Sequence, residues 1–96
     1  MPTSASFAAR PGERIDVEGL AGYLARDGYN RVGTVREPGE YALRGGIVDV
    51  FPPGSEEPVR LDLFGDTLES IRTVDPLSQR TTGNAAELSS KPVSEV

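Results

Sequence analysis

The sequence predicts a small α+β domain in which one N-terminal helix packs on a small antiparallel β-sheet of about five strands. Two observations support this fold class. Between residues 17 and 27, apolar side chains recur at helical spacing, at Val17, Leu20, Ala21 and Leu24. The following part of the chain holds short runs of β-forming residues, separated by turn signals about every eight to twelve residues, as in an antiparallel meander.

The predicted helix has recognisable start and stop signals. Asp16 can cap its first turn by accepting a hydrogen bond from a backbone N–H, and Gly28 after Asp27 is typical of a helix end. Gly19 and Gly22 each weaken an isolated helix by about 1 kcal/mol relative to alanine. We therefore expect the helix to depend on packing against the sheet.

The predicted strands are short and are bounded by glycine, proline or acidic residues that favour turns. They are Tyr29–Val35, Tyr41–Arg44, Ile47–Phe51, Val59–Phe64 and Leu68–Val74. Gly45 and Gly46 suggest a bulge or bend in one ribbon, which does not require a full reversal of the chain. The expected core consists of apolar residues from the helix and the strands: Leu20, Leu24, Ile47 or Val48, Val59, Leu61, Leu63, and Leu68 or Ile71.

The strand Val59–Phe64 alternates strictly, so its side chains divide between two faces of the sheet. One face receives the apolar residues Val59, Leu61 and Leu63, and the other receives Arg60, Asp62 and Phe64. We expect Arg44 to lie near this second face, where arginine and an aromatic ring are typical interface residues. The alternative is an ordinary Arg–Asp surface pair beside a phenylalanine that the chain's own tail covers.

The composition excludes several classes of function. The chain has 96 residues, a net charge of −5, no histidine and no cysteine. These absences exclude disulfides, thiolate metal sites and histidine-based catalytic triads, and the charge argues against a nucleic-acid-binding domain. No apolar run approaches the ~20 residues of a membrane span, and no signal peptide is recognisable, so we expect a cytoplasmic protein.

The length favours a single folded domain with polar ends. Residues 1–13 are rich in Ser, Ala and Pro and are predicted to be extended or disordered. Residues 14–80 carry all of the predicted helix and strands and form the expected domain. Residues 81–96 are polar, and we expect a poorly ordered segment there.

A second class of function would depend on carboxylates. Glu56 and Glu57 are adjacent in a predicted turn, and Asp62, Asp66, Glu69 and Asp75 are scattered further along the chain. Carboxylates perform acid–base chemistry only when they share a cleft. The alternative to an interaction module is therefore a small independent ligand-binding or hydrolytic β-rich domain. No phosphate-binding loop is present, and no catalytic, cofactor-binding or metal-binding residue is assigned.

A long ungapped segment resembles a known family. RGGIVDVFPPGSEEPVRLDLFGDTLESIR, followed by DPLSQRT and preceded by GYNRVGTVREPGEYALRGG, closely resembles the UvrB-homology region of bacterial transcription-repair coupling factors (Mfd). The resemblance covers residues 14–81 and includes Gln79-Arg80. The related domain of the repair protein UvrB usually has RGD where this chain has Arg44-Gly45-Gly46, and it lacks the PPGSEEP turn.

The resemblance implies a module that binds the damage-sensing ATPase UvrA and recruits it by mimicking UvrB. In the family, contact with UvrA falls on an arginine of the RGG motif, the arginine of PVR and a phenylalanine of the following strand. The matching residues here are Arg44, Arg60 and Phe64. These residues coincide with the face identified from strand alternation.

The resemblance also implies that this module is not an enzyme. Its parent would be a multidomain, ATP-driven DNA translocase that removes stalled RNA polymerase and recruits repair. ATP and Mg²⁺ would belong to the parent's motor, and RNA polymerase and DNA would contact other domains. We expect the chain itself to be a monomer that needs no cofactor.

Overall fold

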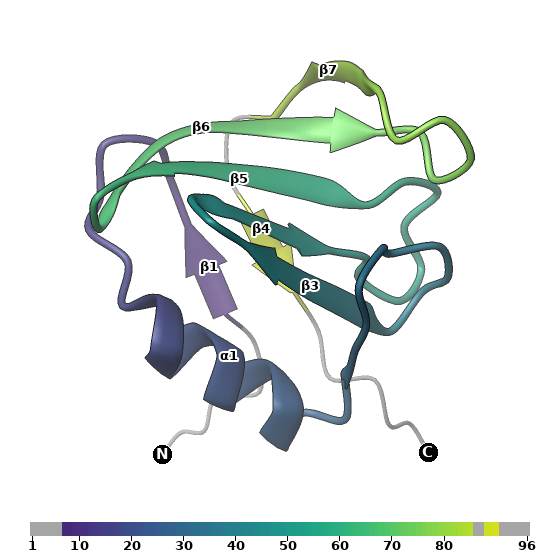
Figure 1. The fold of residues 1–96 in the computed structure, drawn as a ribbon, viewed down its shortest axis with the longest axis horizontal. Coiled ribbons are helices and arrows are strands. Elements are labelled where there is room, and N and C mark those ends of the chain that lie inside the picture. The colour runs from purple at the N-terminus through teal and green to yellow at the C-terminus, as the bar shows by residue number, and fades with distance from the viewer. Residues whose placement is uncertain (1–6, 86–87, 91–96) are drawn as a thin grey trace.

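The computed structural model describes residues 7–85 and 88–90, and within them it confirms the α+β fold with one helix and a mostly antiparallel sheet (Figure 1). The elements in chain order are β1 (Phe7–Ala9), α1 (Val17–Arg26), β2 (Asn30–Arg31), β3 (Glu40–Arg44), β4 (Ile47–Val50), β5 (Val59–Phe64), β6 (Thr67–Val74), β7 (Thr81–Asn84) and β8 (Leu88–Ser90). No helix in the described part of the chain is long and apolar enough to cross a membrane.

The main sheet has six strands in the order β2-β3-β4-β5-β6-β7. Its strands pair in antiparallel fashion from β3 to β7, while β2 runs parallel to β3. A separate antiparallel pair joins β1 to β8, so segments from near the two ends of the chain lie side by side. Figure 1 shows α1 lying along one side of the main sheet.

The helix forms nearly as predicted, but its N-terminus is not capped as predicted. Asp16 is the N-cap residue, yet its carboxylate makes no capping hydrogen bond, and only its backbone carbonyl accepts from Leu20 N, at 2.8 Å. A side chain at position 19 would place its Cβ 2.7 Å from Oδ2 of Asp16, so the absence of a side chain at Gly19 prevents a clash with this carboxylate. The helix buries Leu20 and Leu24 against the sheet, and this packing offsets the lower helix propensity of its two glycines.

The main core lies between α1 and the sheet and contains most of the predicted residues. Its buried members are Ile15, Leu20, Leu24, Tyr29, Tyr41, Val48, Val50, Leu61, Leu68 and Ile71. Val59 and Leu63 pack against this cluster while remaining partly exposed. A second small cluster on the other side of the sheet consists of Val35, Ala42 and Phe51.

The predicted strand Tyr29–Val35 is wrong over most of its length, because only β2 is a strand and it pairs in parallel. The end of this segment leaves the sheet plane and buries Val35 against Ala42 and Phe51 on the side away from α1. In the sequence, a buried apolar residue of a loop cannot be distinguished from a buried apolar residue of a strand.

The Gly45-Gly46 turn is a full reversal and not a bend in one ribbon. Arg44 pairs directly with Ile47, which leaves the two glycines as the loop of a β3–β4 hairpin. Gly45 has a φ of +53°, a conformation that residues with a Cβ adopt at a cost. A Cβ at position 46 would lie 2.8 Å from the carbonyl oxygen of Leu63, so glycine also permits close approach of β5.

The structure also has strands in the C-terminal segment, where little order was expected, and the short strand β1 in the N-terminal segment, which was expected to be extended or disordered. Strand β7 extends the main sheet beyond β6, and all four of its residues are exposed. Thr82 holds this polar strand through hydrogen bonds of 2.8 Å to Thr73 and 3.1 Å to Glu57. Such a strand is stabilised by its backbone ladder and lacks the apolar alternation that a sequence reveals. Residues 1–6, 86–87 and 91–96 of the predicted terminal segments lie outside the described residues.

Candidate functional site

The sheet face opposite α1 brings together the three residues proposed from the sequence. Strand register pairs Asp49 with Arg60, and Ile47 with both Arg44 and Asp62. The register shift between β5 and β6 places its extra residue on β6, so β5 alternates without interruption up to Phe64. We call the resulting surface the Arg–Phe face, defined by Arg44, Ile47, Asp49, Arg60, Asp62 and Phe64.

A buried carboxylate lies at the centre of the Arg–Phe face. The Asp49 side chain is 3% exposed, and its two oxygens accept from Nε and Nη2 of Arg60 at 2.8 and 3.0 Å. Nη2 of Arg44 donates to the same carboxylate at 3.3 Å. Two-point pairing with a guanidinium is the strongest common form of ion pair, and a buried carboxylate requires such partners. Asp49 therefore holds Arg60 through two short hydrogen bonds and Arg44 through one longer contact.

Arg60 serves the fold as well as the surface. Its side chain is only 14% exposed, and its Nη1 donates to the backbone oxygen of Gln79 at 3.4 Å in addition to the two bonds with Asp49. The hydrogen bond with Asp49 raises the pKa of Arg60 above its ordinary value, despite the opposing effect of burial, so the group stays charged. These three bonds use three of the five N–H groups of the guanidinium.

Phe64 and Arg44 are the accessible members of the Arg–Phe face. Phe64 is 76% exposed, as the sequence predicts for an interaction surface, and no described part of the chain covers it. The Arg44 side chain is 49% exposed. The backbone N–H of Leu63 donates to Gly46 at 2.8 Å, so the end of β5 adjoins the β3–β4 turn. The exposed ring and the exposed guanidinium thus lie at the same end of the sheet.

Asp62 lies toward the edge of the Arg–Phe face and pairs with groups on β6. Its carboxylate accepts from the Ser70 hydroxyl at 3.2 Å and lies 3.8 Å from Nε of Arg72. The two charged side chains are 32% and 47% exposed, so solvent screens their interaction. This pair contributes to the charge pattern of the surface more than to its rigidity.

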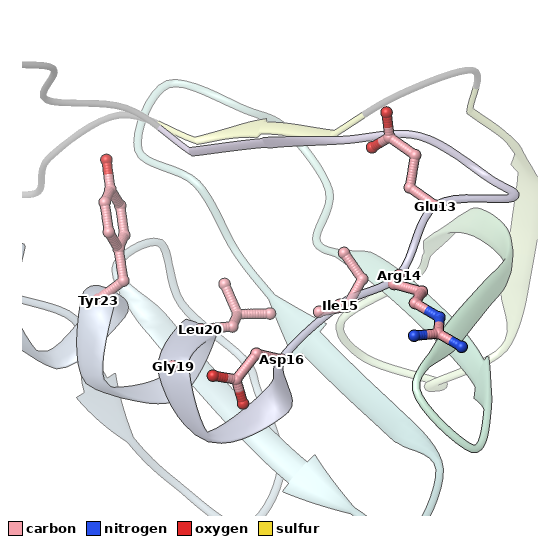
Figure 2. A pocket seen from close by; sticks show the side chains of 7 residues that line it. All are labelled: Glu13, Arg14, Ile15, Asp16, Gly19, Leu20 and Tyr23. Atoms are coloured by element: carbon pink, nitrogen blue, oxygen red, sulfur yellow. The ribbon is translucent and has the colours of Figure 1, made fainter.

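The carboxylates considered for a hydrolytic site do not converge. The described chain has no group of three acidic side chains placed to hold a metal ion. A cavity of about 240 Å³ lies at the start of α1, and Figure 2 shows its lining: Glu13, Arg14, Ile15, Asp16, Gly19, Leu20 and Tyr23. None of the candidate carboxylates lines it, and only Asp66 lines a neighbouring hollow of about 590 Å³.

Asp49 is the functional residue that reasoning from the sequence missed. The available signal was a charged residue between Val48 and Val50, inside an apolar run. A charged residue in such a position is rarely buried unless it is paired. Strand register, which pairs it with Arg60, identifies the partner.

Comparison with known proteins places the sequence of this chain in a family. The UvrB interaction domain family matches residues 7–95. The transcription-repair-coupling factor of Myxococcus xanthus is 45% identical over 85 residues, which cover 88% of this chain and 7% of that protein. The coupling factor of Escherichia coli K12 is 42% identical over 90 residues, which cover 94% of this chain and 8% of that protein.

A repair protein of a different kind is also similar. The UvrABC system protein B of Thermosipho africanus is 37% identical over 75 residues, which cover 78% of this chain and 11% of that protein. The chain thus spans only 7 to 8% of the length of the two coupling factors. The predicted resemblance is confirmed, and the chain belongs to the UvrB interaction domain family.

Proposed function

We propose that this chain is a protein-interaction module that binds UvrA through the Arg–Phe face. The observation that carries the proposal is the exposed Phe64 ring at the same end of the sheet as the exposed Arg44, on a surface where the buried Asp49 pairs with both arginines. Exposed aromatic rings and preorganised arginines are typical of interface hot spots. The similarity to both coupling factors and a UvrABC system protein B supports one surface used by two kinds of protein.

We further propose that the module serves transcription-coupled repair by recruiting UvrA in place of UvrB. Because both proteins would present the same surface, binding of one to UvrA would exclude the other. The chain itself would act in the cytoplasm as a monomer, without catalysis and without a cofactor. ATP, Mg²⁺, DNA and RNA polymerase would engage other parts of a coupling factor.

The alternative, a small ligand-binding or hydrolytic domain, has less support. The candidate carboxylates are dispersed, and Glu57 is engaged with Thr82 at 3.1 Å. The cavity beside α1 lies on the helix side of the sheet, away from the Arg–Phe face. Acid–base chemistry requires convergent groups in one cleft.

A calorimetric titration of the chain against purified UvrA tests the proposal directly. Phe64→Ala is expected to weaken binding by about 2 kcal/mol, roughly thirtyfold in affinity, without lowering the melting temperature. Arg44→Ala is expected to weaken binding as well. Glu18→Ala, an exposed change on α1, is the matched control and is expected to bind as wild type does. Absence of any binding by the wild-type chain would refute the proposal.

A further inference from the structure

The loop between β6 and β7 exposes a second large apolar side chain. Leu77 is 90% exposed, and with Phe64 it forms the pair of large hydrophobic residues exposed in the described part of the chain. A single exposed leucine is ordinary on a protein surface. The loop that carries Leu77, however, is held by a set of hydrogen bonds that an ordinary surface loop does not need.

Hydrogen bonds close this loop on itself. The Asp75 carboxylate accepts from the backbone N–H of Leu77 at 3.0 Å and from the hydroxyl of Ser78 at 3.1 Å. The Asp75 backbone adds two bonds, accepting from Gln79 N at 2.7 Å and donating to the carbonyl of Arg80 at 2.8 Å. The loop therefore presents Leu77 from a fixed backbone and not from a flexible one.

Gln79 ties the loop to the rest of the molecule. Its side-chain amide donates to the carbonyl oxygens of Pro76 at 2.8 Å and Val35 at 3.0 Å. Its own carbonyl accepts from Nη1 of Arg60 at 3.4 Å. Its φ is +65°, a conformation that is costly for a residue with a Cβ and persists where surrounding contacts impose it. The loop is thus attached directly to the Arg–Phe face through Arg60.

We propose that Leu77 is a second apolar anchor for UvrA and that Gln79 is the residue that positions it; this rests on the proposed function. The loop that carries Leu77 reaches the Arg–Phe face at Arg60, and Arg60 and Phe64 are four steps of about 3.3 Å apart along β5, or about 13 Å, which is within the span of one interface. A standard interface buries about 800 Å² on each partner, equivalent to a disc about 32 Å across. The partner surface would offer an apolar depression beside acceptors for the remaining N–H groups of Arg60.

Titration of the full chain against purified UvrA tests Leu77. Leu77→Ser is expected to weaken binding about tenfold, equivalent to about 1.4 kcal/mol, with an unchanged melting temperature because the side chain is exposed. Glu18→Ser, on α1, is the matched control and is expected to bind as wild type does. Wild-type affinity in Leu77→Ser would overturn the inference, and so would a loss of affinity that merely follows a lower melting temperature.

A second variant tests the positioning role. Gln79→Gly keeps the positive φ and the backbone acceptor for Arg60 but removes both side-chain bonds, and it is expected to weaken binding roughly threefold by loosening the loop. In the Leu77→Ser background the same change is expected to add nothing, because Gln79 would act through Leu77. Full additivity would overturn the positioning role.

The outcomes separate this inference from the proposed function. If the wild-type chain does not bind UvrA, both fail. If the wild-type chain binds and Phe64→Ala weakens the binding while Leu77→Ser does not, the proposed function stands and the second anchor is rejected.

Discussion

The ion pair between Asp49 and Arg60 allows a quantitative test of how the Arg–Phe face is held together. The test consists of Asp49→Ala, Arg60→Ala and the double variant, each measured for its free energy of unfolding. In the wild-type chain the two side chains are 3% and 14% exposed and share hydrogen bonds of 2.8 and 3.0 Å. Each single variant leaves one charge without its main partner, whereas the double variant leaves neither.

The magnitude follows from burial. Removing one partner of a fully buried ion pair costs about 3–5 kcal/mol, because a charge remains uncompensated. Arg60 keeps some contact with solvent, and Arg44, half exposed, contributes less than about 1 kcal/mol to Asp49. We therefore expect each single variant to lose about 3 kcal/mol, a large part of the about 5–15 kcal/mol that stabilises a domain. The double variant is expected to lose about 3–4 kcal/mol, which gives a coupling energy of about 2–3 kcal/mol.

Urea denaturation followed by circular dichroism measures these free energies. A matched control is Arg72→Ala, which removes the exposed 3.8 Å pair with Asp62 and is expected to cost less than about 1 kcal/mol. If the two single effects add to within about 0.5 kcal/mol in the double variant, the pair does not act as a unit and the reasoning is refuted. A further consequence is that the UvrA affinity of Arg60→Ala must be measured on its folded fraction.

Three further predictions concern the core, the turn and the charge of the surface. Leu61→Ala is expected to cost about 2–5 kcal/mol, whereas Phe64→Ala should barely change the melting temperature; equal losses would mean that Phe64 is a core residue. Gly46→Ala is expected to destabilise the chain by about 1–3 kcal/mol in urea denaturation, because its Cβ would lie 2.8 Å from the carbonyl of Leu63. The chain alone is expected neither to hydrolyse ATP nor to bind duplex DNA tightly at physiological salt; micromolar, strongly salt-dependent binding would reveal a basic face.

The elements that could be predicted are those whose signals are local. Strand β5 has the predicted bounds, Val59–Phe64, because strict alternation between two glycine- or proline-rich turns fixes both its type and its ends. The helix agrees to within one residue for the same reason. The prediction of a strand over Tyr29–Val35 failed because only Asn30–Arg31 forms a strand and Val35 is buried from a loop on the side of the sheet away from α1, and β7 was missed because it is polar throughout.

The candidate site was predictable only in part. Exposure of Phe64 follows from alternation within one strand. The role of Asp49 depends on contacts with Arg60, which is 11 residues away, and the role of Gln79 depends on Val35, which is 44 residues away. Such contacts are set by strand register and loop packing, and no periodic pattern in the chain records them.

The pairing of β1 with β8 has a mechanical consequence. Phe7 pairs with Ser90 and Ala9 with Leu88, so the first residue of β1 and the last residue of β8 lie at the same end of this two-stranded ribbon. Tension that pulls residues 7 and 90 apart would therefore load the backbone hydrogen bonds of the ribbon one pair at a time, as in opening a zipper, while the six-stranded sheet stays closed. In optical tweezers we expect a small extension at low force before the main unfolding event. A single cooperative event would show that the ribbon and the sheet open together.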